Sequence, residues 1–225
     1  MNETEITLVY PTPILKQTCE DAPSVNAGLK AAILERARPP TGATKSNVGG
    51  WHSETDVFDW PVPEVRTLLG WVGKATKSMM SATSRMPGVT GDLEAWAWAN
   101  VLYDGGYNLP HLHADCMWSG VYYVDVGEPD PDSELCGVLE LMDPRPGIDI
   151  LKVPGMPFSG GFRVEPRDGL MVMFPSWLYH FVRPYHGSRP RISVAFNLRI
   201  VDTNLPDGVV GGAISYPLMK TSDPG

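Results

Sequence analysis

The chain has 225 residues, of which 43% are hydrophobic and 20% charged, and its net charge is −8. This composition is ordinary for a soluble globular protein and allows one large domain or two small ones. The acidic balance argues against a nucleic-acid-binding surface, which needs clustered lysines and arginines.

The cysteine content and the length of the apolar runs indicate the cellular compartment. The three cysteines lack CxxC spacing, so they predict neither a disulfide framework nor a zinc knuckle and favour a reducing compartment. The first residues show no basic stretch followed by an apolar core, and no run approaches the roughly 18 apolar residues of a membrane helix. We therefore expect a cytoplasmic protein with no membrane partner and, by default, a homodimer.

The first 90 residues are expected to be mainly helical. A short strand is predicted over residues 6–10. An apolar residue at every fourth position predicts a helix from an N-cap at Ser24 to about Arg36. A broader apolar stripe predicts a second helix over about residues 63–85. The polar stretch between them, residues 41–59, predicts a long loop near the mouth of a pocket.

From residue 93 onward the apolar period changes to two, which is typical of strands. A strand over 93–103 is expected to end in a turn at Asp104-Gly105-Gly106. Further strands are expected over residues 118–126, 137–142, 161–165, 170–174, 178–183 and 191–201.

Two helices followed by about eight short strands predict a mainly β protein. The expected architecture is an antiparallel barrel or jelly roll, with the helices packed outside one sheet. We expect one domain over 1–225: a helical part to about 90, a catalytic β core over about 91–201, and a tail over 202–225.

Two histidines just before a predicted strand are candidate metal ligands. On extended backbone, residues two apart point the same way, so His111, His113 and Asp115 can face one side. His180, from a distant strand, would complete a facial set. Two histidines and one carboxylate with open positions suit non-haem Fe(II).

Two ligand sets remain open. In the first, His113 and Asp115 bind with His180, and a carboxylate partly neutralises the charge of Fe(II). In the second, His111 replaces Asp115 and gives three histidines. His113 belongs to both sets, and the first is slightly favoured.

The last predicted strand looks like the wall of a pocket. Small and polar residues alternate with the apolar residues Ile192, Val194, Phe196 and Leu198, which must pack against an outer layer. On the polar face, Arg191 would bind a carboxylate bidentately, and Ser193 would add a hydrogen bond.

Other candidates are weaker. Tyr123 and Tyr103 could share the carboxylate held by Arg191, whereas the neighbouring Tyr122 is expected to pack in the core. His52 and His186 have no spacing that suggests a role, and both are expected at the surface.

Taken together, these segments resemble the Fe(II)/2-oxoglutarate-dependent oxygenase superfamily. More narrowly, the chain is similar to the 2OG-Fe(II) oxygenases of bacteria and phages, which are prolyl-hydroxylase-like. The resemblance spans about Trp96 to Leu198 and rests on three segments, YNLPHLH…SGVYYV, GVLELMDPR and PRDGLMVMFPSWLYHFVRP…RISVAFN.

The resemblance implies a cupin-like double-stranded β-helix, with iron held by the histidine doublet region and His180 and 2-oxoglutarate held by Arg191. The pattern in prolyl hydroxylases would align His113 with an aspartate. The register therefore either slides by two onto Asp115, or the site is a three-histidine one.

The expected activity is that of a dioxygenase that uses Fe(II), 2-oxoglutarate and O2 and releases succinate and CO2. It would hydroxylate a small-molecule or peptide substrate. Two alternatives remain: a cupin-like metalloenzyme that does not use 2-oxoglutarate, and a non-catalytic jelly-roll binding module. The cupin-like alternative gives Arg191 no obvious task.

Overall fold

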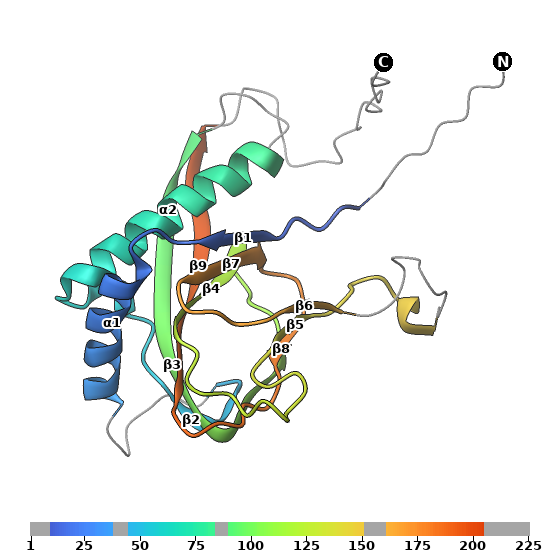
Figure 1. Ribbon diagram of the computed structural model, residues 1–225. Coiled ribbons are helices and arrows are strands. Elements are labelled where there is room, and N and C mark those ends of the chain that lie inside the picture. The colour runs from blue at the N-terminus through green and yellow to red at the C-terminus, as the bar shows by residue number, and fades with distance from the viewer. Residues whose placement is uncertain (1–9, 38–44, 84–89, 151–160, 205–225) are drawn as a thin grey trace, which may run out of the picture.

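The computed structural model describes residues 10–37, 45–83, 90–150 and 161–204, and Figure 1 shows their arrangement. In chain order the elements are β1 (Leu15–Thr18), α1 (Ala22–Arg36), β2 (Asn47–His52), the 3-10 helix η1 (Val57–Asp59), α2 (Pro63–Thr83), β3 (Thr90–His111), β4 (Trp118–Asp125), β5 (Leu139–Leu141), the 3-10 helix η2 (Ile148–Ile150), β6 (Phe162–Val164), β7 (Leu170–Pro175), β8 (His180–Val182) and β9 (Arg191–Asn204).

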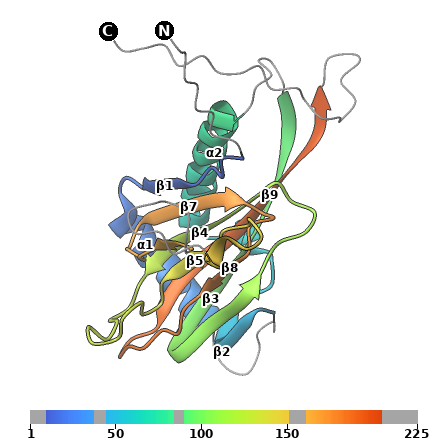
Figure 2. The same cartoon turned by 90° about the vertical axis from the view of Figure 1, so that its right-hand side faces the viewer.

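The strands form one antiparallel sheet in the order β1-β7-β4-β9-β3-β8-β5-β6, and β2 pairs with β3 outside this path. The sheet curls into a half-barrel, because β5 and β6 at one end pack against β4 and β7 (Figure 2). Side chains of the inner face join them: Tyr123, Leu139, Leu141, Val164, Val172, Phe174 and Leu178. The expected mainly β fold is confirmed.

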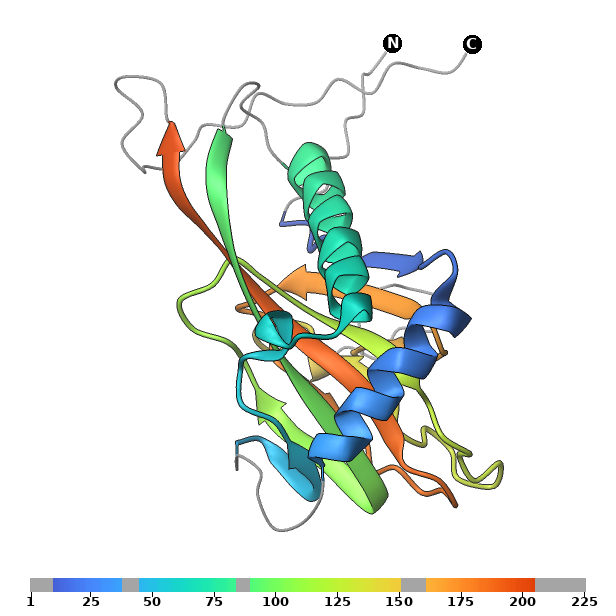
Figure 3. The ribbon, with the colours of Figure 1, turned by 90° about the vertical axis from the view of Figure 1, so that its left-hand side faces the viewer.

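Both long helices lie on the outer face of the sheet, as Figure 3 shows. Leu68 and Val72 of α2 belong to the same buried cluster as the apolar face of β9. That face consists of Ile192, Val194, Phe196 and Leu198, each fully buried. The prediction that this face packs against an outer layer is confirmed, so the opposite, polar face of β9 is turned inward.

A glycine in β4 allows the close packing of this outer layer. Gly120 lies opposite Phe196 of β9. A Cβ atom added to Gly120 would come within 2.4 Å of the Phe196 ring, so any larger residue would displace the phenylalanine. The segment SGVYYV therefore needs glycine here to let the Phe196 ring lie across β4.

The stretch predicted as a long loop contains ordered elements. Residues 47–52 form β2, and residues 57–59 form η1. β2 adds an edge to β3, with His52 opposite Asn100. The loop prediction was wrong here because isolated polar and glycine residues conceal a strand that is stabilised by its partner rather than by its own sequence.

Two local predictions were also wrong. The turn at Asp104-Gly105-Gly106 lies inside β3, which continues to His111. Its Gly105 has φ +78°, so the irregularity bends the strand without ending it. Ser24 lies inside α1; the helix is capped at Asp21, and the Ser24 hydroxyl donates to the Asp21 carbonyl.

Several predictions agree with the structure. The end of the first helix at Arg36 is confirmed, and the second helix begins at Pro63 as expected. The strands predicted from residue 118 onward are all found, with slightly different bounds. Nearly all of the predicted strand over 6–10 and nearly all of the tail lie outside the described residues.

Replacing Leu68 tests the helix-to-sheet contact. The fully buried side chain of Leu68 packs in the cluster that joins α2 to β9. Leu68→Ala should lower the free energy of unfolding by about 2–5 kcal/mol, since it leaves a cavity. The matched control Leu69→Ala, at a position 39% exposed, should change it by less than about 1 kcal/mol. Equal effects in urea denaturation would contradict this packing.

Candidate metal centre

Two candidate ligands are brought together by the pairing of β3 with β8. His111 at the end of β3 lies directly opposite His180 at the start of β8. Opposed residues of antiparallel strands share one face, so the two side chains meet although 68 residues lie between them in the sequence. Just beyond β3, the backbone N–H of His113 donates to the Ser176 carbonyl at 3.0 Å, which holds the third histidine nearby.

The three histidines form a compact group. One nitrogen from each of His111, His113 and His180 lies within 4.8 Å of the others. The Nε2 atoms of His113 and His180 are 3.3 Å apart. Among the described residues, this is the group of His, Cys, Asp and Glu side chains that could hold a metal ion. The donors are three imidazoles, a set that suits iron, zinc, copper or nickel.

Backbone carbonyls select the tautomer of two of these rings. Nδ1 of His111 is 2.7 Å from the Leu109 carbonyl, and Nδ1 of His180 is 2.8 Å from the Leu178 carbonyl. A carbonyl oxygen only accepts, so Nδ1 must carry the proton in each ring. The lone pair is then on Nε2, the atom that is left free to bind a metal.

Burial keeps these imidazoles neutral. It lowers the pKa of His113 to about 4 and that of His180 to about 3, and the neighbouring His111 adds to both shifts. Burial also lowers the pKa of His111. Since only a neutral imidazole can donate to a metal, the three rings have the charge state that metal binding requires at neutral pH.

The structure does not bring Asp115 into this group. Asp115 is exposed and adopts a left-handed backbone conformation with φ 58°. The left-handed residue breaks the extended alternation on which a shared face of His113 and Asp115 depends. The geometry thus favours the second ligand set, in which His111, His113 and His180 bind the metal.

Polar and aromatic neighbours position His113. Nδ1 of His113 is 3.4 Å from the Asn197 side-chain amide, and the Ser119 hydroxyl donates to the same amide at 2.8 Å. The Trp98 ring lies 5.5 Å from the His113 ring. Asn197 thus links the histidine to the inner faces of β4 and β9. Asn197 lies on the polar face predicted for the last strand, but no role was predicted for it.

Arg191 is buried inside the half-barrel without an ionic partner. It is only 2% exposed, and no described carboxylate forms an ion pair with it. Its contacts are the Ser193 hydroxyl, 3.5 Å from Nη1, and the Tyr123 ring, whose centroid is 5.0 Å from Cζ. Arg191 Nε and Tyr123 Oη are buried with no hydrogen-bond partner among the described residues.

Burial acts on both of these groups. It lowers the pKa of the Arg191 guanidinium and raises the pKa of the Tyr123 phenol. A buried charge without a counter-ion is costly, and so is a buried donor without an acceptor. The cluster of Arg191, Tyr123 and Ser193 is therefore shaped for an anion with several acceptor oxygens.

Other predicted residues lie elsewhere. Tyr103 is 45% exposed, so the structure does not bring it beside Arg191. Tyr122 packs in the outer core as expected, and its hydroxyl donates to Asn26 at 2.6 Å. His186 is exposed, also as expected.

The surface assignment of His52 was wrong. It is 5% exposed, and its ring stacks on Trp98 at 5.7 Å. Its partner across the strands, Asn100, is 7% exposed. Sequence reasoning missed both because the pairing of β2 with β3, which turns His52 inward, has no local signal.

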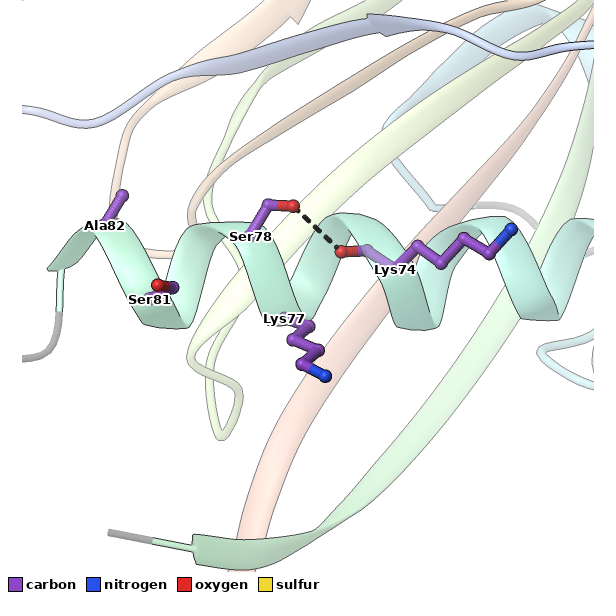
Figure 4. Close-up of a pocket in the computed structure, with 5 residues that line it drawn as sticks. All are labelled: Lys74, Lys77, Ser78, Ser81 and Ala82. Atoms are coloured by element: carbon purple, nitrogen blue, oxygen red, sulfur yellow. Dashed lines mark hydrogen bonds between the residues drawn. The ribbon is translucent and has the colours of Figure 1, made fainter. Parts of the chain in front are cut away.

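Depressions elsewhere do not involve the histidines. Figure 4 shows one along α2, lined by Lys74, Lys77, Ser78, Ser81 and Ala82. There the Ser78 hydroxyl donates to the Lys74 carbonyl at 3.2 Å, an ordinary contact within a helix. Among the described residues, no helix has the length and apolar character needed to cross a membrane.

Three converging imidazoles and a buried arginine, inside a curled β half-barrel, are the residues that a non-haem metal enzyme with an anionic ligand would need. Comparison with known families gives this class a name. Residues 96–197 match the model of the family described as "Putative 2OG-Fe(II) oxygenase". This segment, which contains the three histidines and Arg191, is thus similar to 2OG-Fe(II) oxygenases.

Solved structures share the fold. A prolyl-4-hydroxylase from Pseudomonas putida superimposes with a TM-score of 0.59 at 18% identity, covering 83% of this chain and 91% of that one. A prolyl hydroxylase from Trichoplax adhaerens, in complex with a hypoxia inducible factor peptide fragment, gives 0.54 at 14% identity, covering 84% and 83%. HygX from Streptomyces hygroscopicus, with nickel and 2-oxoglutarate bound, gives 0.53 at 12% identity, covering 84% and 83%.

These comparisons confirm four predictions: the resemblance, the jelly-roll fold, the dioxygenase class and the cofactors Fe(II) and 2-oxoglutarate. At these identities the solved structures establish the fold alone, and the enzyme class and cofactors follow from the family match. A search of curated protein sequences found no match.

Removing Asn197 should weaken metal binding without removing a ligand. Asn197→Leu deletes the amide that contacts Nδ1 of His113, so the ring loses its orientation. Loss of such an outer partner typically costs 10–100-fold in metal affinity, and we expect about that loss here. Calorimetric titration with Fe(II) or Co(II) measures it. The control Asn108→Leu, whose amide contacts Ser46 instead, should bind metal normally.

Proposed function

We propose that the protein is an oxygenase in which His111, His113 and His180 hold Fe(II) and Arg191 holds the far carboxylate of 2-oxoglutarate. The reaction would be hydroxylation of a small-molecule or peptide substrate, with release of succinate and CO2. One observation carries this proposal: three converging imidazoles and a buried, unpaired guanidinium share one interior.

The residues present fit both groups. The Nε2 lone pairs of His111 and His180 are freed by carbonyl contacts at Nδ1, which is the state a metal ligand needs. The buried Arg191 Nε and Tyr123 Oη lack partners that a carboxylate would supply. The free Nε2 lone pairs thus match a cation, and the unpartnered groups of Arg191 and Tyr123 match an anion.

When bound, iron and 2-oxoglutarate supply the oxidising chemistry. The chain's own residues supply geometry. Arg191 would donate a fork of hydrogen bonds to a carboxylate, with Ser193 and Tyr123 as further hydroxyl partners. Asn197 would orient His113 through its Nδ1 atom. The apolar side chains of β5, β6 and β7 line the interior.

For the third ligand we propose His111 in place of Asp115. Only the histidine belongs to the compact group, and Asp115 is exposed on a left-handed residue. A three-histidine set leaves the full charge of Fe(II) on the site, since no carboxylate neutralises it. Anionic 2-oxoglutarate would then provide the neutralising charge.

The two rivals explain less. A cupin-like metalloenzyme without 2-oxoglutarate would use the histidines but leave Arg191 buried without an ionic partner. A non-catalytic binding module would use neither. The family match favours the oxygenase over both.

The wider biology is also a proposal. The similarity to a prolyl hydroxylase in complex with a peptide fragment supports a peptide substrate. The three free cysteines and acidic composition support a cytoplasmic protein that does not bind nucleic acid. The packing of both helices on the sheet supports one domain over the described residues.

Anaerobic titration tests the site. Adding Fe(II) and then 2-oxoglutarate should produce the weak visible charge-transfer band of an iron-bound 2-oxoglutarate. His180→Ala and His111→Ala should abolish the band, because each removes one of three ligands, whereas Asp115→Ala should keep it. A band lost in Asp115→Ala but kept in His111→Ala would instead establish the carboxylate set.

Replacing Arg191 tests the co-substrate. Arg191→Met should keep metal binding but lose most of the affinity for 2-oxoglutarate. It should not lower the melting temperature, since replacing an unpaired buried charge by an apolar side chain is neutral or stabilising. The control Arg189→Met removes an exposed arginine paired with Glu128 at 3.0 Å, and it should bind 2-oxoglutarate normally. Iron binding with no band in the wild type would favour the cupin-like rival.

A further inference from the structure

Beyond the metal ligands and Arg191, a row of polar side chains crosses the inner face of the sheet. The strand register places His52 opposite Asn100, Asn100 opposite Ser193, and Ser193 opposite Tyr123. Directly opposed residues lie on one face, so the four form a row across β2, β3, β9 and β4. All four are buried, with 5%, 7%, 3% and 0% of their surface exposed.

The two halves of this row have different neighbours. Ser193 and Tyr123 contact Arg191, and these three residues form the cluster proposed to bind an anion, called the anion pocket below. His52 stacks on Trp98, and Trp98 in turn packs against the ring of His113. The half formed by His52 and Asn100 therefore lies next to the metal-binding group, where a substrate must come.

Asn100 has unused hydrogen-bonding capacity. Its Oδ1 atom is buried and has no hydrogen-bond partner among the described residues. Alternate residues of β3, Ala97, Ala99 and Val101, pack in the outer core, so Asn100 is on the inner side. A buried acceptor without a donor is unfavourable, so this oxygen is suited to a ligand that brings one.

His52 also presents an acceptor. Its Nδ1 atom is 2.5 Å from the Ser53 carbonyl, which can only accept, so Nδ1 carries the proton. Burial lowers the pKa of His52, so the ring is neutral at neutral pH. In a neutral ring protonated at Nδ1, the Nε2 atom has a free lone pair. Neighbouring positions in the row thus offer two acceptors.

We propose that His52 and Asn100 bind the primary substrate, and that this substrate presents hydrogen-bond donors, as a hydroxyl or amine group does. This rests on the proposed oxygenase function and deepens it by naming a substrate class. A substrate group with acceptors alone would leave Asn100 Oδ1 and His52 Nε2 without a donor. The pair thus selects for donors, while Arg191 selects for the anionic co-substrate.

Small probes of equal length test the selectivity. Butanediol and protonated butanediamine carry donors, whereas dimethoxyethane has a chain of the same length with acceptors only. Binding to the protein loaded with Zn(II) and 2-oxoglutarate is measured by saturation-transfer NMR. Zinc prevents turnover, and the protonated diamine does not compete for the metal. We expect a signal from one or both donor probes and none from dimethoxyethane.

Two substitutions test the residues. Asn100→Leu removes the unpaired acceptor at nearly constant volume, and His52→Phe keeps the stacking on Trp98 but removes the ring nitrogens. Each should weaken binding of the donor probes by about three- to tenfold, the effect of one hydrogen bond. Asn108→Leu on the same strand and His186→Phe at the surface are matched controls that should bind as the wild type does.

Stability separates recognition from a structural role. Because Asn100 Oδ1 has no partner, Asn100→Leu should keep or raise the melting temperature while it loses probe binding. A lower melting temperature with unchanged probe binding would make Asn100 structural and overturn the proposal. Equal binding of dimethoxyethane and the donor probes, or no binding of any probe, would also overturn it.

The two proposals fail differently. An intact charge-transfer band with donor binding unaffected by either substitution would overturn the recognition pair alone. A missing band, with selective donor binding that is lost in both variants, would overturn the oxygenase proposal and leave the pair as a ligand site.

Discussion

The constraint on which the structure depends is the two-residue alternation along the paired strands β3 and β9. One face of this ladder carries alanine, valine, isoleucine and phenylalanine and packs against α1 and α2. The other face carries Trp98, Asn100, Arg191, Ser193 and Asn197 and lines the interior. A slip of one residue would turn Arg191 into the apolar outer layer and expose its partners, so burial of the outer face fixes the register of the inner one.

This arrangement separates stability from function. The helix-to-sheet core contains most of the clustered buried apolar residues, and the interior can therefore hold polar groups that have no partners of their own. Arg191 Nε, Tyr123 Oη and Asn100 Oδ1 are three such atoms. Each is unfavourable in the folded chain alone, and each has the chemistry that a bound ligand would satisfy. These atoms without partners are the ones to which the proposed ligands would bind.

Backbone contacts fix the orientation of two of the three imidazoles. His111 and His180 are fixed by carbonyls two residues earlier in their own segments, Leu109 and Leu178. The same contact, from Nδ1 to a backbone carbonyl, fixes the His111 and His180 rings and leaves their Nε2 atoms free. His113, in the loop after β3, completes the group of three. Because the fixing contacts are to backbone, the ligand geometry depends little on other side chains, except at Asn197.

Much of the fold could be read from the sequence, because periodicity is local. The change of period near residue 93, the two apolar helix stripes and the two faces of β9 predicted the elements, the outer layer and the inward Arg191. The histidine doublet and His180 were found as residue types at a suggestive spacing. The sequence determined which side chains could bind metal and anion, since residue type and alternation need no tertiary information.

Tertiary structure decided the rest. Whether His111 or Asp115 joins the metal group depended on the left-handed residue Asp115 and on the pairing of His111 with His180. The burial of His52 depended on β2 pairing with β3, although its strand looks like a loop in sequence. Tyr103 lies outside the anion pocket because its neighbour Leu102 is the residue paired with Arg191, so Tyr103 points to the opposite face of β3. Such contacts join residues far apart in the chain, and their energies appear only when the strands meet.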